Sequence, residues 1–160
     1  MRPARAFWPG IGIAILVVAA DQLTKWWIIY EVMAPPRVIE VTPFFNLVMT
    51  WNPGISFGLF NTGSPLNALV LSMLALLIVA LLLVWLYRSD RLFIGGGIGL
   101  ISGGAIGNVI DRFRFGAVAD FLDFHVAGYH WPAFNVADSM ITIGAAMIVL
   151  DTLFDRGQTR

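Results

Sequence analysis

The chain has 160 residues, of which 58% are hydrophobic and only 12% are charged, and its mean hydropathy is +0.79. An average soluble domain carries about 25% charged residues, so this composition excludes that class. Ten basic and ten acidic residues give a net charge of zero, and no overall field attracts nucleic acid. The absence of cysteine excludes disulfides, thiol catalysis and thiolate metal sites. The composition predicts an integral membrane protein.

Four apolar stretches are each long enough to cross a bilayer, which takes about 20 residues. In chain order we expect transmembrane helices at about 7–30, 65–87, 92–110 and 134–154. The first stretch has features of a cleavable signal peptide, but it stays apolar well past Ala20, so we expect it to span.

Two longer loops join these spans, at about 31–64 and 111–133. The first loop is rich in β-branched and aromatic residues between turn signals, which predicts one or two short strands. We find no linker or repeat and expect one domain over residues 1–160. The predicted fold is an all-α membrane protein of four transmembrane helices with a small β-containing loop region.

Basic residues indicate the orientation. With four spans, six of them share a side with the termini: Arg2, Arg5, Arg88, Arg91, Arg156 and Arg160. Four lie on the other side: Lys25, Arg37, Arg112 and Arg114. The excess predicts termini in the cytoplasm and the two longer loops outside, which in a bacterium means the periplasm.

Glycine recurs every fourth residue in the third span, at Gly95, Gly99, Gly103 and Gly107. Such a row lets helix backbones approach closely in lipid, so we expect it to serve helix packing rather than ligand binding. The row leads to polar residues at the end of this span.

Polar side chains cluster at the outer membrane face, where they are costly and often functional. Asn108 and Asp111 share a face near the end of the third span, Asp120 lies in the second loop, and Asn135 and Asp138 begin the fourth span. Two neighbouring carboxyls share one proton, so the ionised one can activate water while the protonated one polarises a carbonyl. That is peptide hydrolysis without a metal.

Other interpretations of these acids remain open. Asp138 at a helix start can act as a cap, and Asp111 can pair with Arg112 or Arg114. A small proton-coupled transporter also uses carboxylates within the membrane. The four-residue spacing of Asp21 and Lys25 predicts an ion pair within the first span, and we expect this pair to have a structural role.

Two histidines in the second loop raise the question of a metal site. His125 and His130 lie near Asp123, but their spacing matches no ligand signature, so we expect no metal and no cofactor. Asp123 is a secondary candidate. In an extended segment it would lie on the opposite face from Asp120, whereas in a helix the two would share a face.

The polar clusters coincide with five motifs, and together they make the chain resemble the bacterial lipoprotein signal peptidases, or signal peptidase II. The motifs are DQLTK (21–25), WNPGISFG (51–58), GGAIGNVIDR (103–112), VADF (118–121) and FNVADS (134–139). The resemblance covers nearly the whole chain, in order. The second motif departs from the family at Pro53 and at Ile55-Ser56.

The resemblance implies a monomeric aspartic endopeptidase of the inner membrane. It would cleave diacylglyceryl-modified prolipoproteins before the lipidated cysteine, bind membrane lipid and be inhibited by globomycin-type antibiotics. The implied catalytic pair is Asp120 and Asp138, and Asp21 and Lys25 match a motif of structural character. The positions implied to bind substrate or orient the pair are Asn52, Gly54, Asn108, Asp111, Arg112 and Asn135.

Overall fold

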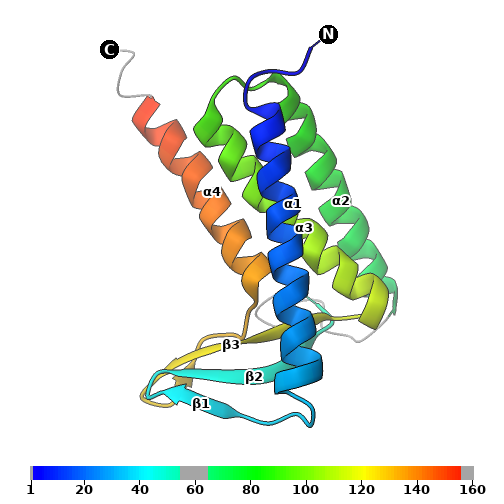
Figure 1. The fold of residues 1–160 in the computed structure, drawn as a ribbon, viewed down its shortest axis with the longest axis vertical. Coiled ribbons are helices and arrows are strands. Elements are labelled where there is room, and N and C mark those ends of the chain that lie inside the picture. Colours follow the sequence, from blue (N-terminus) through cyan, green and yellow to red (C-terminus); the bar gives the residue numbers. More distant parts are fainter. Residues whose placement is uncertain (1, 55–64, 156–160) are drawn as a thin grey trace.

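Four long helices dominate the computed structural model, which describes residues 2–54 and 65–155. They are α1 (Phe7–Trp27), α2 (Pro65–Arg88), α3 (Leu92–Phe115) and α4 (Val136–Asp155). Each is long and apolar enough to cross a membrane. Helix α1 continues into a π-helical turn, η1 (Ile28–Val32). The start of α1 and the end of α4 lie at the same end of the bundle, as Figure 1 shows.

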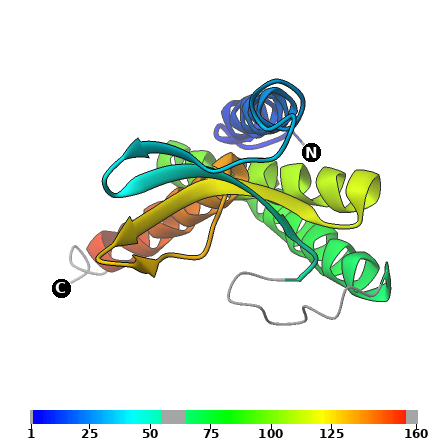
Figure 2. The same cartoon turned by 90° about the horizontal axis from the view of Figure 1, so that it is seen from below.

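A small antiparallel sheet lies across the opposite end of the bundle (Figures 1 and 2). Its strands are β1 (Ile39–Thr42), β2 (Phe45–Asn52), β3 (Val118–Val126) and β4 (Tyr129–His130), in the order β1-β2-β3-β4. The first loop therefore contains both expected strands. The second loop supplies two more, which the sequence did not predict. The predicted fold class, four apolar helices with a small β-containing region, is confirmed.

Helix α3 is longer than predicted, and this corrects the expected loop at 111–133. The helix continues five residues beyond 110 to Phe115, so Asp111 and Arg112 lie on its last turns. It ends at Gly116, whose φ of 74° is a left-handed conformation that suits glycine and whose N–H donates to the carbonyl of Arg112. The apolar stretch itself ends near residue 110, but basic residues suit a helix C-terminus, and the helix continues through Arg112 and Arg114.

The glycine row of α3 packs closely against α1, as predicted. A Cβ on Gly103 would lie 2.6 Å from the backbone oxygen of Ala14, and one on Gly99 would collide with the backbone of Gly10. A Cβ on Gly104, on a neighbouring face, would lie 2.5 Å from the backbone oxygen of Ala137 in α4. Helix α3 is thus in backbone contact with helices on two sides, which fixes the residues at its end relative to both.

Candidate active site

Asp120 and Asp138 come from different elements that meet beneath the bundle. Asp120 lies near the start of β3, and Asp138 lies in the first turn of α4. The start of α4 is held by a reciprocal pair of hydrogen bonds. The Asp138 N–H donates to Asn135 Oδ1 at 2.9 Å, and the Asn135 N–H donates to Asp138 Oδ2 at 3.3 Å. This arrangement is a capping box, so the interpretation of Asp138 as a cap is confirmed.

Three asparagine side chains hold the two carboxyl groups. Asn52 and Asn135 donate to the two oxygens of Asp120, at 3.1 and 2.7 Å. Asn108 donates to Asp138 Oδ1 at 2.8 Å. Asn135 therefore bonds to both aspartates, through its side-chain amide to Asp120 and through its backbone to Asp138. The structure brings these five predicted residues together.

The environment of Asp120 favours its protonated form. Only 2% of the residue is exposed. Burial raises the pKa of Asp120 to about 7, and the negative charge of Asp138 adds to the rise, while hydrogen bonds from Asn52 and Asn135 oppose it. A carboxyl with this pKa can hold or release a proton at neutral pH. General acid–base catalysis requires that capacity.

Arg112 connects the end of α3 with the first loop. Its Nη2 donates to the carbonyl of Gly54 at 2.9 Å and its Nη1 to the carbonyl of Asn108 at 3.4 Å. The Gly54 N–H donates in turn to Asn52 Oδ1 at 3.1 Å, which closes a tight turn around Pro53. Pro53, where the second motif departs from the family, therefore leaves Asn52 in contact with Asp120. Ile55-Ser56 lie outside the described residues.

Asp21, Lys25 and Asp111 form a buried ion cluster beside the two aspartates. Lys25 Nζ lies 2.9 Å from Asp21 Oδ2 and 2.8 Å from Asp111 Oδ2. The predicted Asp21–Lys25 pair is thus confirmed. The suggested pairing of Asp111 with a neighbouring arginine is wrong, because Asp111 binds Lys25 across the helix interface.

Gln22 also belongs to this cluster, although it was not among the residues predicted from the sequence. Its Nε2 donates to Asp111 Oδ1 at 3.0 Å and to Asp21 Oδ2 at 3.2 Å. Its place beside Asp21 in the DQLTK motif was the available signal.

Asp123 and the histidines lie at the far end of β3 and form a separate cluster. Asp123 accepts from Asn46 at 3.1 Å and lies 2.9 Å from His130 Nδ1, and the rings of His125 and His130 stack. Burial acts to raise the pKa of Asp123, but the hydrogen bonds from His130 and Asn46 have the larger combined effect. The pKa of Asp123 is therefore below its usual range. Among the residues that the structure describes, no hydrogen bond joins this cluster to Asp120 or Asp138.

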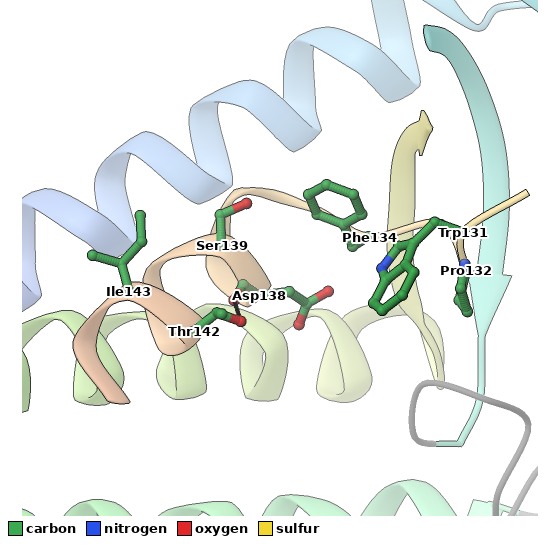
Figure 3. Close-up of a pocket in the computed structure, with 7 residues that line it drawn as sticks. All are labelled: Trp131, Pro132, Phe134, Asp138, Ser139, Thr142 and Ile143. Atoms are coloured by element: carbon green, nitrogen blue, oxygen red, sulfur yellow. Dashed lines mark hydrogen bonds between the residues drawn. The ribbon is translucent and has the colours of Figure 1, made fainter. Parts of the chain in front are cut away.

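A groove of about 440 Å³ opens beside Asp138. In Figure 3 the side chain of Asp138 extends from the first turn of α4 towards Trp131, which lies on the segment that precedes this helix. The other lining residues are Trp131, Pro132, Phe134, Ser139, Thr142 and Ile143. An apolar chain that lies along α4 in this groove reaches a carboxyl at its end.

The chain is similar to known proteins over most of its length. The family model described as signal peptidase (SPase) II matches residues 13–154. A lipoprotein signal peptidase of Nitrobacter hamburgensis is 45% identical over 157 residues, covering 95% of this chain and 94% of that protein. One of Desulforapulum autotrophicum is 41% identical over 147 residues, covering 90% and 91%.

Solved structures show the same fold. One, described as a bacterial membrane enzyme, matches with a TM-score of 0.86 at 32% identity, covering 100% of this chain and 96% of that chain. A second of the same description has a TM-score of 0.80 at 33% identity, covering 96% and 97%. With a family model over most of its length, close relatives in sequence and a shared membrane-enzyme fold, this multi-pass membrane chain belongs to the signal peptidase II family.

Proposed function

We propose that this chain removes signal peptides from diacylglyceryl-modified prolipoproteins, cleaving before the lipidated cysteine with Asp120 and Asp138 as its catalytic pair. The chain's relatives are lipoprotein signal peptidases, which supports the substrate class. One observation carries the choice of residues. Asn135 bonds both carboxyl groups, so β3 and α4 present them to one another at one place.

One aspartate acts as the base that activates a water molecule, and the other acts as the acid that protonates the scissile carbonyl. Asp138, at the N-terminal turn of α4, is the ionised member, because the helix dipole favours negative charge there. It takes a proton from water as the oxygen attacks the scissile carbonyl. Asp120, whose pKa is raised to about 7 chiefly by burial, donates its proton to the carbonyl oxygen. The proton on Asp138 then passes to the leaving nitrogen, and the pair titrates as a unit.

The substrate reaches the pair from the lipid. The groove beside Asp138 has an apolar lining on the outer side of α4, which suits the apolar part of a signal peptide. The diacylglyceryl chains remain in the bilayer, where each buried CH₂ contributes about 0.8 kcal/mol of anchoring. Chains of this kind outweigh a single hydrogen bond, so the lipid dominates recognition.

The proposed setting is the bacterial inner membrane. The termini lie in the cytoplasm and the sheet with the catalytic pair lies at the periplasmic face, in line with the distribution of arginine. The protein acts as a monomer. A globomycin-type inhibitor occupies the catalytic pair and competes with the prolipoprotein.

A cleavage assay on purified protein in detergent tests the proposal. The substrate is a synthetic prolipoprotein, with and without its diacylglyceryl group, and cleavage is read as a gel shift. The variants are Asp120→Asn and Asp138→Asn, with Asp123→Asn as a matched control on the same strand as Asp120. We expect cleavage of the lipidated form alone, lost in the first two variants and largely retained in the control.

Three results would contradict the proposal. Turnover by either Asp120→Asn or Asp138→Asn would rule out Asp120 and Asp138 as the catalytic pair. Complete loss in Asp123→Asn would indicate the wrong acid on β3. A folded wild-type protein that leaves the lipidated substrate intact would favour the proton-coupled transporter, which an efflux assay with an uncoupler then tests.

A further inference from the structure

The buried ion cluster is joined to the backbone beside each proposed catalytic aspartate. Asp111 Oδ2 accepts a hydrogen bond from the Ala119 N–H at 3.2 Å, and Ala119 immediately precedes Asp120. Asp21 Oδ1 accepts one from the Ala137 N–H at 3.0 Å, and Ala137 immediately precedes Asp138. Each acid of the cluster thus binds the backbone N–H of the residue just before a proposed catalytic aspartate: Asp111 binds that N–H on β3, and Asp21 binds it on α4.

Lys25 ties the two acids together and adds a third connection. Its Nζ pairs with Asp21 and Asp111 and also donates to Asn108 Oδ1 at 3.0 Å. The amide of the same Asn108 donates to Asp138. One ammonium group therefore lies two hydrogen bonds from a proposed catalytic carboxyl, and it fixes which way the Asn108 amide faces.

Stability alone is a poor explanation for this cluster. Asp21, Lys25 and Asp111 are between 0% and 2% exposed, with two negative charges against one positive charge. The cost of removing such charges from water often equals or exceeds their mutual attraction, and apolar residues of the same volume commonly serve a fold as well. A buried ion cluster is better suited to fixing geometry, because its contacts are directional.

We infer that Asp21, Lys25 and Asp111 are positioning residues, which set the distance and orientation between Asp120 and Asp138 by holding the backbone that precedes each of them. This inference rests on the proposed function and gives α1 a role in it. The α1 helix supplies neither catalytic carboxyl, yet its Asp21 bonds the backbone of α4. Its Lys25 pairs with Asp111 of α3, which bonds the backbone of β3. Gly107 of α3 supports the arrangement, because a Cβ there would collide with the Asp21 carboxyl group.

The two acids use their oxygens differently, and this difference provides a test. Asp111 uses a single oxygen, Oδ2, for both Lys25 and Ala119. Asp21 uses Oδ2 for Lys25 and Oδ1 for Ala137. An asparagine at 111 keeps both contacts through its one oxygen once the partly exposed Gln22 side chain moves away, which gives up the Gln22 hydrogen bonds to Asp21 and to the Gly107 carbonyl. An asparagine at 21 keeps only one of its two contacts. The two substitutions remove the same charge.

The experiment compares Asp21→Asn, Asp111→Asn and Asp111→Leu in the prolipoprotein cleavage assay, with kcat and KM measured separately. Size-exclusion chromatography and thermal unfolding in detergent report whether each variant folds. Asp151→Asn is the control for loss of an interhelical ion pair, because Asp151 pairs with Arg91 at 2.9 Å near the opposite end of α3 and α4. The wild type gives the upper limit of activity in this assay, and Asp120→Asn gives the lower limit.

We expect Asp21→Asn and Asp111→Leu to lower kcat by about 30-fold or more while KM stays within about threefold, because misplacement of reacting groups by about 1 Å costs on the order of 100-fold in rate. Asp111→Asn should retain at least about ten times the kcat of Asp111→Leu and of Asp21→Asn. The control Asp151→Asn should cleave as the wild type does. This pattern follows from which backbone contact survives and not from the charge removed.

Other patterns overturn the positioning role. They are equal losses in the two asparagine variants, a kcat near that of wild type in Asp21→Asn, or failure of both Asp21→Asn and Asp111→Leu to fold, which would make the cluster a folding element. A wild type that does not cleave would instead refute the proposed function, so the two failures are distinguishable.

Discussion

Replacing Asp120 by asparagine should make the stability of the variant rise relative to that of the wild type as the pH increases from 5 to about 7. Asp120 is buried, and burial is the main cause that raises its pKa from 3.8 to about 7. Between these two values the folded protein keeps a proton that the unfolded chain has released. A raised pKa in the folded state means that wild-type stability falls as pH rises towards 7.

The size of the effect follows from linkage. The free energy of unfolding falls by about 1.4 kcal/mol per pH unit wherever the folded state holds one more proton. Between pH 5 and pH 8 only the first two units count, so the wild type loses roughly 3 kcal/mol through Asp120. Asparagine does not titrate. It does place an amide donor against Asn52 or Asn135, a cost of about 1–3 kcal/mol that is independent of pH.

The assay is thermal unfolding in detergent at pH 5, 6, 7 and 8 for wild type and Asp120→Asn. The difference in melting temperature between variant and wild type should rise by on the order of 5–10 °C over this range. Asp90→Asn serves as the control, because that exposed carboxyl lies between α2 and α3 at the end of the bundle remote from the sheet. A difference that stays constant with pH would refute the reasoning about Asp120, whatever its sign.

Three further outcomes follow from the structure. Cleavage should decline as the pH rises through about 7, because Asp120 loses the proton it donates, and a pH profile of kcat that is still rising at pH 9 would contradict this. Gly104→Ala should destabilise the folded protein by about 1–3 kcal/mol, because the added Cβ would collide with the α4 backbone. Gly96→Ala on the same helix is the control, because a Cβ there has room. Equal melting temperatures of the two variants would contradict this prediction. Asp123→Asn should lower stability at neutral pH, and since the folded-state pKa of Asp123 is lowered, the difference from wild type should shrink as the pH falls below about 4. Thermal unfolding at pH 7 and pH 3.5 checks this, and a difference that grows in acid would count against it.

The sequence was informative wherever a single segment carried the signal. Apolar length alone predicts the four spans, and the four-residue glycine period predicts the close packing of α3. The spacing of Asn135 and Asp138 indicates a shared helix face, and the structure turns that spacing into a capping box. These features depend on residues that are near one another in the chain.

Features that depend on distant partners were not predictable from the sequence. Strand β3 was expected as loop, because its first residues carry little periodicity and its partner strand β2 lies in the other loop. Asp111 has two arginines within three residues, which suggested a local pair. Its actual partner is Lys25, which the close approach of α1 to Gly107 brings near. The contacts of Asp111 and Asp21 to backbone N–H groups likewise depend on tertiary packing.

The close packing of α3 also bears on how the protein meets bilayers of different thickness. Gly99 and Gly103 lie against the backbone of α1, and Gly104 lies against that of α4. A slide by one residue, about 1.5 Å, would bring a side chain onto a neighbouring backbone. These three helices therefore cannot shorten or lengthen the bundle by slipping, and in a thinner or thicker membrane they tilt together. Asp120 and Asp138 then keep their mutual geometry, and only their depth relative to the lipid headgroups changes.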